Sequence, residues 1–93
     1  MIKSFKCKET EKIFKAKFSK KIPADIQRRA LMKLRSMNIA AELIDLSIPP
    51  ANKLESLKGD RKDHHSIRIN QQWRICFKWI DDNAYDVEII DYH

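Results

Sequence analysis

Five side chains in the second half of the sequence have the chemistry that RNA cleavage without a metal ion would require: Lys58, Arg68, Arg74, Tyr92 and His93. In such a reaction a base removes the proton of the ribose 2′-hydroxyl, cations stabilise the charge on the phosphate, and an acid protonates the leaving 5′-oxygen. Arginine binds phosphate through two parallel N–H groups, and histidine exchanges a proton near neutral pH. The set therefore predicts a phosphate site with several cations and one proton-transfer group.

Four of these residues also have a purely structural explanation, which stays open at this point. The two arginines could pair with Glu88 or Asp91 on the surface of a sheet. Tyr92 could be a half-buried sheet residue. His93 could be a frayed chain end, since the first and last residues of a domain are often disordered.

The two arginines lie in a pattern that predicts a β-hairpin. Apolar and polar residues alternate over 66–70 and again over 73–79, as they do on the two faces of a strand. With 70–72 as a three-residue loop, Arg68 lies opposite Arg74, and every apolar residue falls on the other face. A shift by one residue would put arginines in the core, so the pattern selects this register. Two facing arginines repel each other, and an anion between them would remove that repulsion.

A second hairpin follows. The turn-forming residues 81–83 are predicted as a three-residue loop, which places Trp79 opposite Tyr85. On the arginine face, Lys78 then lies opposite Asp86 as an opposite-charge pair. The same loop aligns two further apolar pairs, Phe77 with Val87 and Ile75 with Ile89.

Two helices are predicted in the first half of the chain, where they would support the sheet. The first begins at the N-cap Thr10 and has Ile13, Phe14 and Phe18 on its buried side. The second begins at Pro23, because a missing N–H costs nothing at the first helical position. Its buried side repeats every 3.6 residues, at Ile26, Ala30, Leu34 and Met37.

Shorter elements complete the predicted fold. Strands are expected within 2–7 and 52–57, and a helical turn within 38–47, which Pro49 ends because proline cannot continue a helix. Helices followed by antiparallel strands predict an α+β fold in which two N-terminal helices pack on a small antiparallel sheet. The length predicts one domain over residues 1–93.

The charge is spread unevenly along the chain. The formal net charge is +6, and residues 1–35 hold 12 of the 19 lysines and arginines but 3 of the 13 acids. Such asymmetry favours an anionic partner, most simply a nucleic acid. The alternative is that these lysines only solvate helix surfaces.

Several classes of protein are disfavoured by the composition. No apolar run is long enough to span a bilayer, and the charged N-terminal segment is unlike a signal peptide. We therefore expect a cytoplasmic protein without a membrane partner, in which Cys7 and Cys76 stay reduced. Neither Cys7 nor the pair His64-His65 has the spacing of a metal site, so no metal and no cofactor is expected.

Four segments in order resemble the HigB (host-inhibition, plasmid-maintenance killer) toxins of the RelE superfamily. They are Met-Ile-Lys-Ser-Phe at 1–5, Leu-Lys-Gly-Asp-Arg at 57–61, the two runs 66–70 and 73–75, and Asp-Tyr-His at 91–93. The resemblance covers the chain from end to end.

The resemblance implies a RelE-like fold and the toxin of a type II toxin-antitoxin system. HigB-like toxins are metal-independent endoribonucleases that enter the ribosomal A site and cleave mRNA by attack of a 2′-hydroxyl on the adjacent phosphate, which inhibits translation. The implied partners are the ribosome with its mRNA, a helix-turn-helix antitoxin of the HigA type, and operator DNA through the toxin-antitoxin complex.

The resemblance also assigns roles to residues. Lys58, Arg68 and Arg74 match the phosphate-handling residues of the family, and Tyr92 with His93 matches its aromatic and acid/base ending. His93 becomes the expected general acid, while a lysine, an aspartate or a phosphate-bound water could each be the base. Basic residues expected to contact RNA are Lys12, Lys15, Arg28 and Arg61.

Other functional classes remain as alternatives. A non-catalytic RNA- or DNA-binding module of the same fold would bind without cleavage and would tolerate loss of His93. A toxin of this fold that acts on a topoisomerase would lack the ribonuclease residues. The presence of Arg74 and His93 argues against that alternative. A protein–protein adaptor has little support, because the sequence indicates no large exposed apolar surface.

Overall fold

The computed structural model describes residues 1–57 and 63–91. Within them, the chain forms the α-helices α1 (Lys8–Phe14) and α2 (Ala24–Ile39), followed by the short 3-10 helices η1 (Leu43–Ser47) and η2 (Pro50–Asn52). The strands are β1 (Glu55–Ser56), β2 (His64–Arg68), β3 (Trp73–Ile80) and β4 (Asn83–Asp91). Helices precede strands, which confirms the predicted α+β fold.

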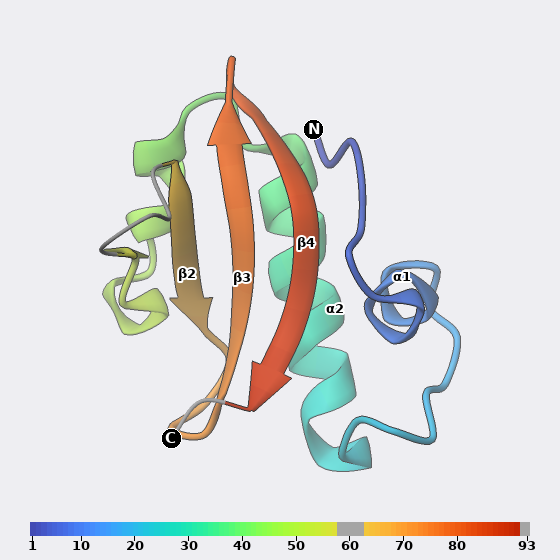
Figure 1. Cartoon of the computed structure of the whole chain (residues 1–93). Helices are drawn as coiled ribbons and strands as arrows, with labels where there is room; N and C mark the ends of the chain where they lie inside the picture. The colour runs from blue at the N-terminus through green and yellow to red at the C-terminus, as the bar shows by residue number, and fades with distance from the viewer. Residues whose placement is uncertain (58–62, 92–93) are drawn as a thin grey trace.

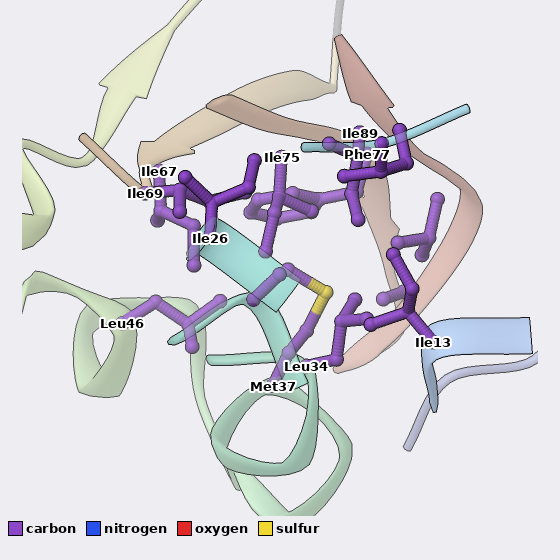
Figure 2. Packing of buried hydrophobic residues seen from close by; sticks show 14 of the residues in the cluster. Ile13, Ile26, Leu34, Met37, Leu46, Ile67, Ile69, Ile75, Phe77 and Ile89 are labelled. Atoms are coloured by element: carbon purple, nitrogen blue, oxygen red, sulfur yellow. The ribbon is translucent and has the colours of Figure 1, made fainter. Parts of the chain in front are cut away.

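The strands form an antiparallel sheet in the order β1-β2-β3-β4. Helix α2 crosses behind one face of this sheet (Figure 1). The predicted helical period is confirmed, because Ile26, Ala30, Leu34 and Met37 are all buried. They meet the inward residues of the strands in one apolar cluster, which Figure 2 shows from close by. No helix in the described part of the chain is long and apolar enough to cross a membrane.

The register of the first hairpin is confirmed. Arg68 is the Cα partner of Arg74, and Ile67 of Ile75. The loop is held by Asn70, whose Oδ1 accepts hydrogen bonds from the N–H groups of Gln72 (2.8 Å) and Trp73 (2.7 Å). An asparagine that caps its own turn in this way explains why the loop has three residues.

The predicted loop of the second hairpin is wrong. The loop contains two residues, Asp81 and Asp82, with φ angles of 50° and 63°, so Ile80 pairs with Asn83 and Trp79 with Ala84. Two positive φ angles are typical of the type I′ turn, whose twist matches that of the flanking strands. Aspartate tolerates this conformation better than most residues.

A β-bulge then corrects the register. Between Cys76 and Lys78 the pairing shifts by one residue, and Asp86 on β4 has a φ angle of 52°. An extra residue in one strand is what a bulge absorbs. Beyond it, Ile75 pairs with Ile89 as predicted. Lys78, however, lies opposite Tyr85 rather than Asp86, so the predicted Lys78–Asp86 register is also wrong.

The first six residues lie alongside β4 (Figure 1). In place of the expected strand, this segment makes two isolated parallel bridges, Ile2 with Ala84 and Phe5 with Val87. The Lys3 N–H donates to the Ala84 carbonyl at 2.7 Å, and Ser4 Oγ accepts from the N–H of the bulge residue Asp86 at 2.9 Å. The segment therefore covers the edge that β4 would otherwise expose.

Helix α1 differs from its prediction at both ends. It begins at Lys8, so Thr10 is not the N-cap; it is buried within the helix, and its Oγ1 accepts a hydrogen bond from the Ile89 N–H at 2.9 Å. The helix ends at Phe14, because the chain turns at Ala16 with a φ angle of 60°. The helical period does not reach Phe18, which is 66% exposed rather than buried.

Candidate functional site

The two arginines lie on the face of the sheet that points away from α2. Arg68 is the last residue of β2 and Arg74 the second residue of β3. On the other side of β3, Arg74 pairs with Ile90 of β4. Trp73 pairs with Asp91, the last residue of β4. The β2–β3 turn and the end of β4 thus lie at the same end of the sheet (Figure 1). The predicted juxtaposition of Arg68 and Arg74 is confirmed.

Arg74 is 3% exposed and tightly held. Its Nε donates to Ser66 Oγ at 2.9 Å, and its Nη2 donates to the Lys53 carbonyl at 2.7 Å and to the Ser66 carbonyl at 3.3 Å. The exposed carboxylate of Glu55 lies 4.0 Å from Nη2. A buried guanidinium is costly unless its donors are satisfied, and these acceptors supply that compensation. The charge of Arg74 is therefore fixed in place before any ligand arrives.

Sequence reasoning missed the acceptors around Arg74. Ser66 is completely buried on the same strand face as Arg68, and that shared face was the available signal. Lys53, which follows η2, has a left-handed backbone (φ 48°, ψ 54°) and supplies its carbonyl. It reaches Arg74 because the chain between α2 and β1 passes round the β2 edge of the sheet (Figure 1). No local pattern in the sequence predicts such a long-range contact.

Arg68 differs from Arg74 in having a donor without an acceptor. Its side chain is half-buried, and Nε is buried with no hydrogen-bond partner among the described residues. Leaving a buried donor unsatisfied costs about 1–3 kcal/mol. A phosphate oxygen beside Arg68 would satisfy Nε and also offset the repulsion between the two facing guanidinium groups.

Four of the predicted site residues lie outside the described residues: Lys58, Arg61, Tyr92 and His93. Their roles stay predictions. The described chain next to them is well held, because the Leu57 N–H donates to the His64 carbonyl at 2.9 Å. At the other end, Asp91 Oδ2 accepts from Gln72 Nε2 at 3.1 Å.

The remaining predicted RNA contacts come from the helices and do not join the arginines. Lys12 is 3.3 Å from Glu9, and Lys15, the residue after α1, is 3.4 Å from Glu11, in ion pairs whose lysines are exposed. Exposed pairs of this kind stabilise a helix by only about 0.3–0.5 kcal/mol, so the lysines can exchange partners at little cost. Arg28 is exposed on α2. As RNA contacts, these three residues stay predictions.

The adjoining histidines point to opposite faces of β2, as a strand requires. His64 lines a polar hollow of about 80 Å³ on the arginine face, together with Cys76 and the ion pair Lys6–Glu88. His65 packs on Phe77 at 5.9 Å between ring centroids, and burial lowers its pKa. Over residues 1–57 and 63–91, no three His, Cys, Asp or Glu side chains gather as a metal site would need.

Comparisons with known proteins agree over almost the whole chain. A family model described as "RelE-like toxin of type II toxin-antitoxin system HigB" matches residues 3–93. The sequence is 37% identical over 93 residues, the full length of both chains, to the Endoribonuclease HigB of Proteus vulgaris. It is 42% identical over 60 residues to Toxin HigB-1 of Vibrio cholerae, covering 64% of this chain and 63% of that toxin. An uncharacterized protein of Haemophilus influenzae is 33% identical over 73 residues, 78% of this chain and 71% of its own length.

Proposed function

The chain belongs to the HigB-like toxins, the RelE-like toxins of type II toxin-antitoxin systems, and from this premise we propose that it cleaves mRNA on the ribosome and so inhibits translation. The full-length relative named an endoribonuclease supports the RNase activity. The observation that carries the proposal is the pair Arg68–Arg74, in which a buried donor without an acceptor faces a fixed guanidinium. Such a pair fits a phosphate group.

The proposed reaction is attack of a ribose 2′-hydroxyl on the adjacent phosphate, which forms a 2′,3′-cyclic phosphate and expels the 5′-oxygen. The hydroxyl gives its proton to a base, which is a lysine, an aspartate or a phosphate-bound water. Arg74 supplies fixed positive charge, and Arg68 donates to a phosphate oxygen where negative charge develops. His93 protonates the leaving oxygen, and Lys58 and Tyr92 position the scissile phosphate. Because the nucleophile is part of the substrate, no metal ion has to generate it.

The partners of this reaction follow from charge and family. A net charge of +6 favours RNA as the partner of the toxin, through contacts that weaken as salt rises. On the ribosome these contacts would involve Lys12, Lys15, Arg28 and Arg61. Membership of a type II system implies an antitoxin. We propose one with a helix-turn-helix domain of the HigA type, which brings the complex to operator DNA, and we place the activity in the cytoplasm, where mRNA is translated.

The test is cleavage of mRNA on purified translating ribosomes, with free RNA as a control. Arg68→Ala and His93→Ala are compared with the wild type and with Arg35→Ala, an exposed arginine on α2. Removing the Arg68 donor to the developing charge should slow cleavage by about 10²–10³-fold. Removing the general acid His93 should slow it by about 10²–10⁴-fold, and Arg35→Ala should cleave normally. Ribosome binding by a wild type that leaves mRNA intact would favour the non-catalytic nucleic-acid-binding module instead.

A further inference from the structure

The outer side of α2 carries apolar residues that nothing in the described chain covers. Met32 is 55% exposed and Ile39 82% exposed, and Ile48, just after η1, is 72% exposed. With Phe18, which also lies outside the core, they make up what we term the outer apolar surface. Soluble proteins rarely leave several large apolar side chains together in water unless they bind a partner there. The sequence alone indicates no large exposed apolar surface and does not single out these side chains.

Three hollows lie along this helix. Their lining residues on α2 fall within 27–31 for the first, 32–39 for the second and 36–39 for the third. The first, about 260 Å³, lies between α1 and α2 and includes Phe18 and Leu31. The second, about 480 Å³, includes Met32 and Ile39, and the third, about 370 Å³, shares Ile39 with it and extends to Ile48.

Helix geometry explains why these residues line up. Arg28, Met32, Arg35 and Ile39 are spaced three or four residues apart and so form one stripe, opposite the buried stripe that contains Leu34. A helix of 16 residues is about 24 Å long. The outer apolar surface is therefore long enough to receive one helix or one extended segment of another protein.

The charges around the surface define the chemistry of the segment that would fit. Lys17 and Arg28 line the first hollow and Arg35 the second. Asp45, in the third, is the one acid among the described residues that line the three hollows. A complementary segment would carry apolar side chains with carboxylates beside them, because opposite charges across an interface steer and orient binding.

Two other occupants fit less well. RNA can contact Arg28 at the rim, as proposed above, but Met32 and Ile39 at the centre of the surface offer neither the aromatic ring nor the guanidinium plane on which bases stack. A second copy of this chain, paired through the same surface about a twofold axis, would bring Arg28 and Arg35 against like charges. A different protein with acidic and apolar residues suits the surface better than either.

We propose that the outer apolar surface of α2 is the docking site of the antitoxin, through a segment of apolar and acidic residues. The inference rests on the proposed antitoxin pairing and does not depend on RNA cleavage. The surface lies on the side of α2 that faces away from the sheet, so it does not include Arg68 or Arg74. Substitutions on it can therefore be separated from substitutions in the candidate site.

The experiment measures binding of the antitoxin, taken as the protein encoded by the reading frame beside the toxin gene, to the full-length chain by calorimetry. Met32→Glu and Ile39→Glu place a carboxylate against the proposed acidic segment, and Arg35→Glu reverses a rim charge. Each should weaken binding about tenfold or more, as substitution of a residue at an interface centre does. Ile80→Glu is the matched control, because Ile80 is an exposed isoleucine at the end of β3 and should bind as the wild type does.

The outcomes separate the alternatives. Cleavage of mRNA in the absence of antitoxin, and the melting temperature, should be unchanged in all four variants. Affinities within twofold of the wild type, or a wild type that does not bind this antitoxin, would overturn the docking proposal. So would variants that lose only ribosome binding, or only self-association measured by light scattering. A wild type that binds the antitoxin through this surface but leaves mRNA intact would overturn the nuclease and keep the docking site.

Discussion

The Nε of Arg74 donates a hydrogen bond of 2.9 Å to the hydroxyl of Ser66 on the neighbouring strand, and both side chains are buried. The same serine accepts from Nη2 through its carbonyl. One residue thus accepts hydrogen bonds from two donors of a buried guanidinium. Ser66 is a positioning residue, because it acts on the phosphate only through Arg74.

Ser66→Ala should lower both stability and turnover. It leaves Nε of Arg74 buried without its side-chain acceptor, which costs about 1–3 kcal/mol of unfolding free energy. Because the guanidinium then keeps its Nη2 contacts with the Lys53 and Ser66 carbonyls but loses the hydroxyl at Nε, its direction is less well fixed, and kcat for mRNA cleavage should fall while KM stays near the wild-type value. Chemical denaturation and single-turnover cleavage measure the two effects. Ser47→Ala, which removes a hydroxyl that donates to the Ile44 carbonyl at the surface, is the control. A loss of stability with unchanged kcat would show that Ser66 is structural only.

Arg68 should show the opposite relation between stability and activity. Its buried Nε has no partner among the described residues, so Arg68→Met removes an unsatisfied donor and a like charge facing Arg74. We expect the melting temperature to stay level or rise, while cleavage falls by about 10²–10³-fold. Thermal unfolding measures the melting temperature, and cleavage of mRNA on translating ribosomes measures the activity. A melting temperature that drops in step with activity would count against a role in binding phosphate.

Thr10 should prove important for stability and neutral for chemistry. Its Oγ1 accepts from the N–H of Ile89, which joins α1 to β4. Thr10→Val keeps the shape but leaves that N–H unsatisfied, at a cost of about 1–3 kcal/mol. Thr10→Ser keeps the acceptor and should lose much less. Urea unfolding of the three proteins gives the comparison, and equal losses in both variants would contradict this role.

Glu9 should contribute stability that depends on pH. The hydroxyl of Ser19, which donates to Oε1 at 2.6 Å, is the main cause that lowers the pKa of Glu9 below its ordinary value of 4.5, and Lys12 adds to it. A carboxylate with a lowered folded-state pKa stabilises the fold above the unfolded pKa, and this contribution is lost as the pH falls through the folded pKa. The melting temperature of Glu9→Gln should lie below that of the wild type at pH 7 and converge with it in acid. Glu11→Gln is the control, and a constant difference from pH 7 to pH 3 would refute the assignment.

The hairpin carrying the arginines could be predicted because a one-residue slip would have buried charge. The loop of the next hairpin could not, for a geometric reason. A three-residue loop and a two-residue loop followed by a bulge both place Ile75 opposite Ile89. Beyond the bulge, both loops give the same alternation of apolar residues. Only the backbone conformation of Asp81 and Asp82 distinguishes the two-residue loop from the three-residue loop.

The sequence predicts which charged residues of the candidate site face each other, but it does not predict that Arg74 is buried. Alternation placed Arg68 opposite Arg74, but burial of Arg74 depends on Lys53 and Glu55, which arrive from outside the hairpin. The exposed apolar surface was missed for a related reason. The buried period of α2 predicts which residues face the sheet. It does not predict that Met32 and Ile39, on the opposite side, are exposed apolar residues that lie near one another.

The contact between residues 1–6 and β4 also orders events during synthesis. β4 is made after every other described element, and it supplies the partners of Lys3 and Ser4 as well as the Ile89 amide that binds α1. Residues 1–6 can therefore form their hydrogen bonds to β4 only after β4 has been synthesised. The arginine pair has no complete sheet around it until then, so the nascent polypeptide stays without an assembled site while most of it is being translated.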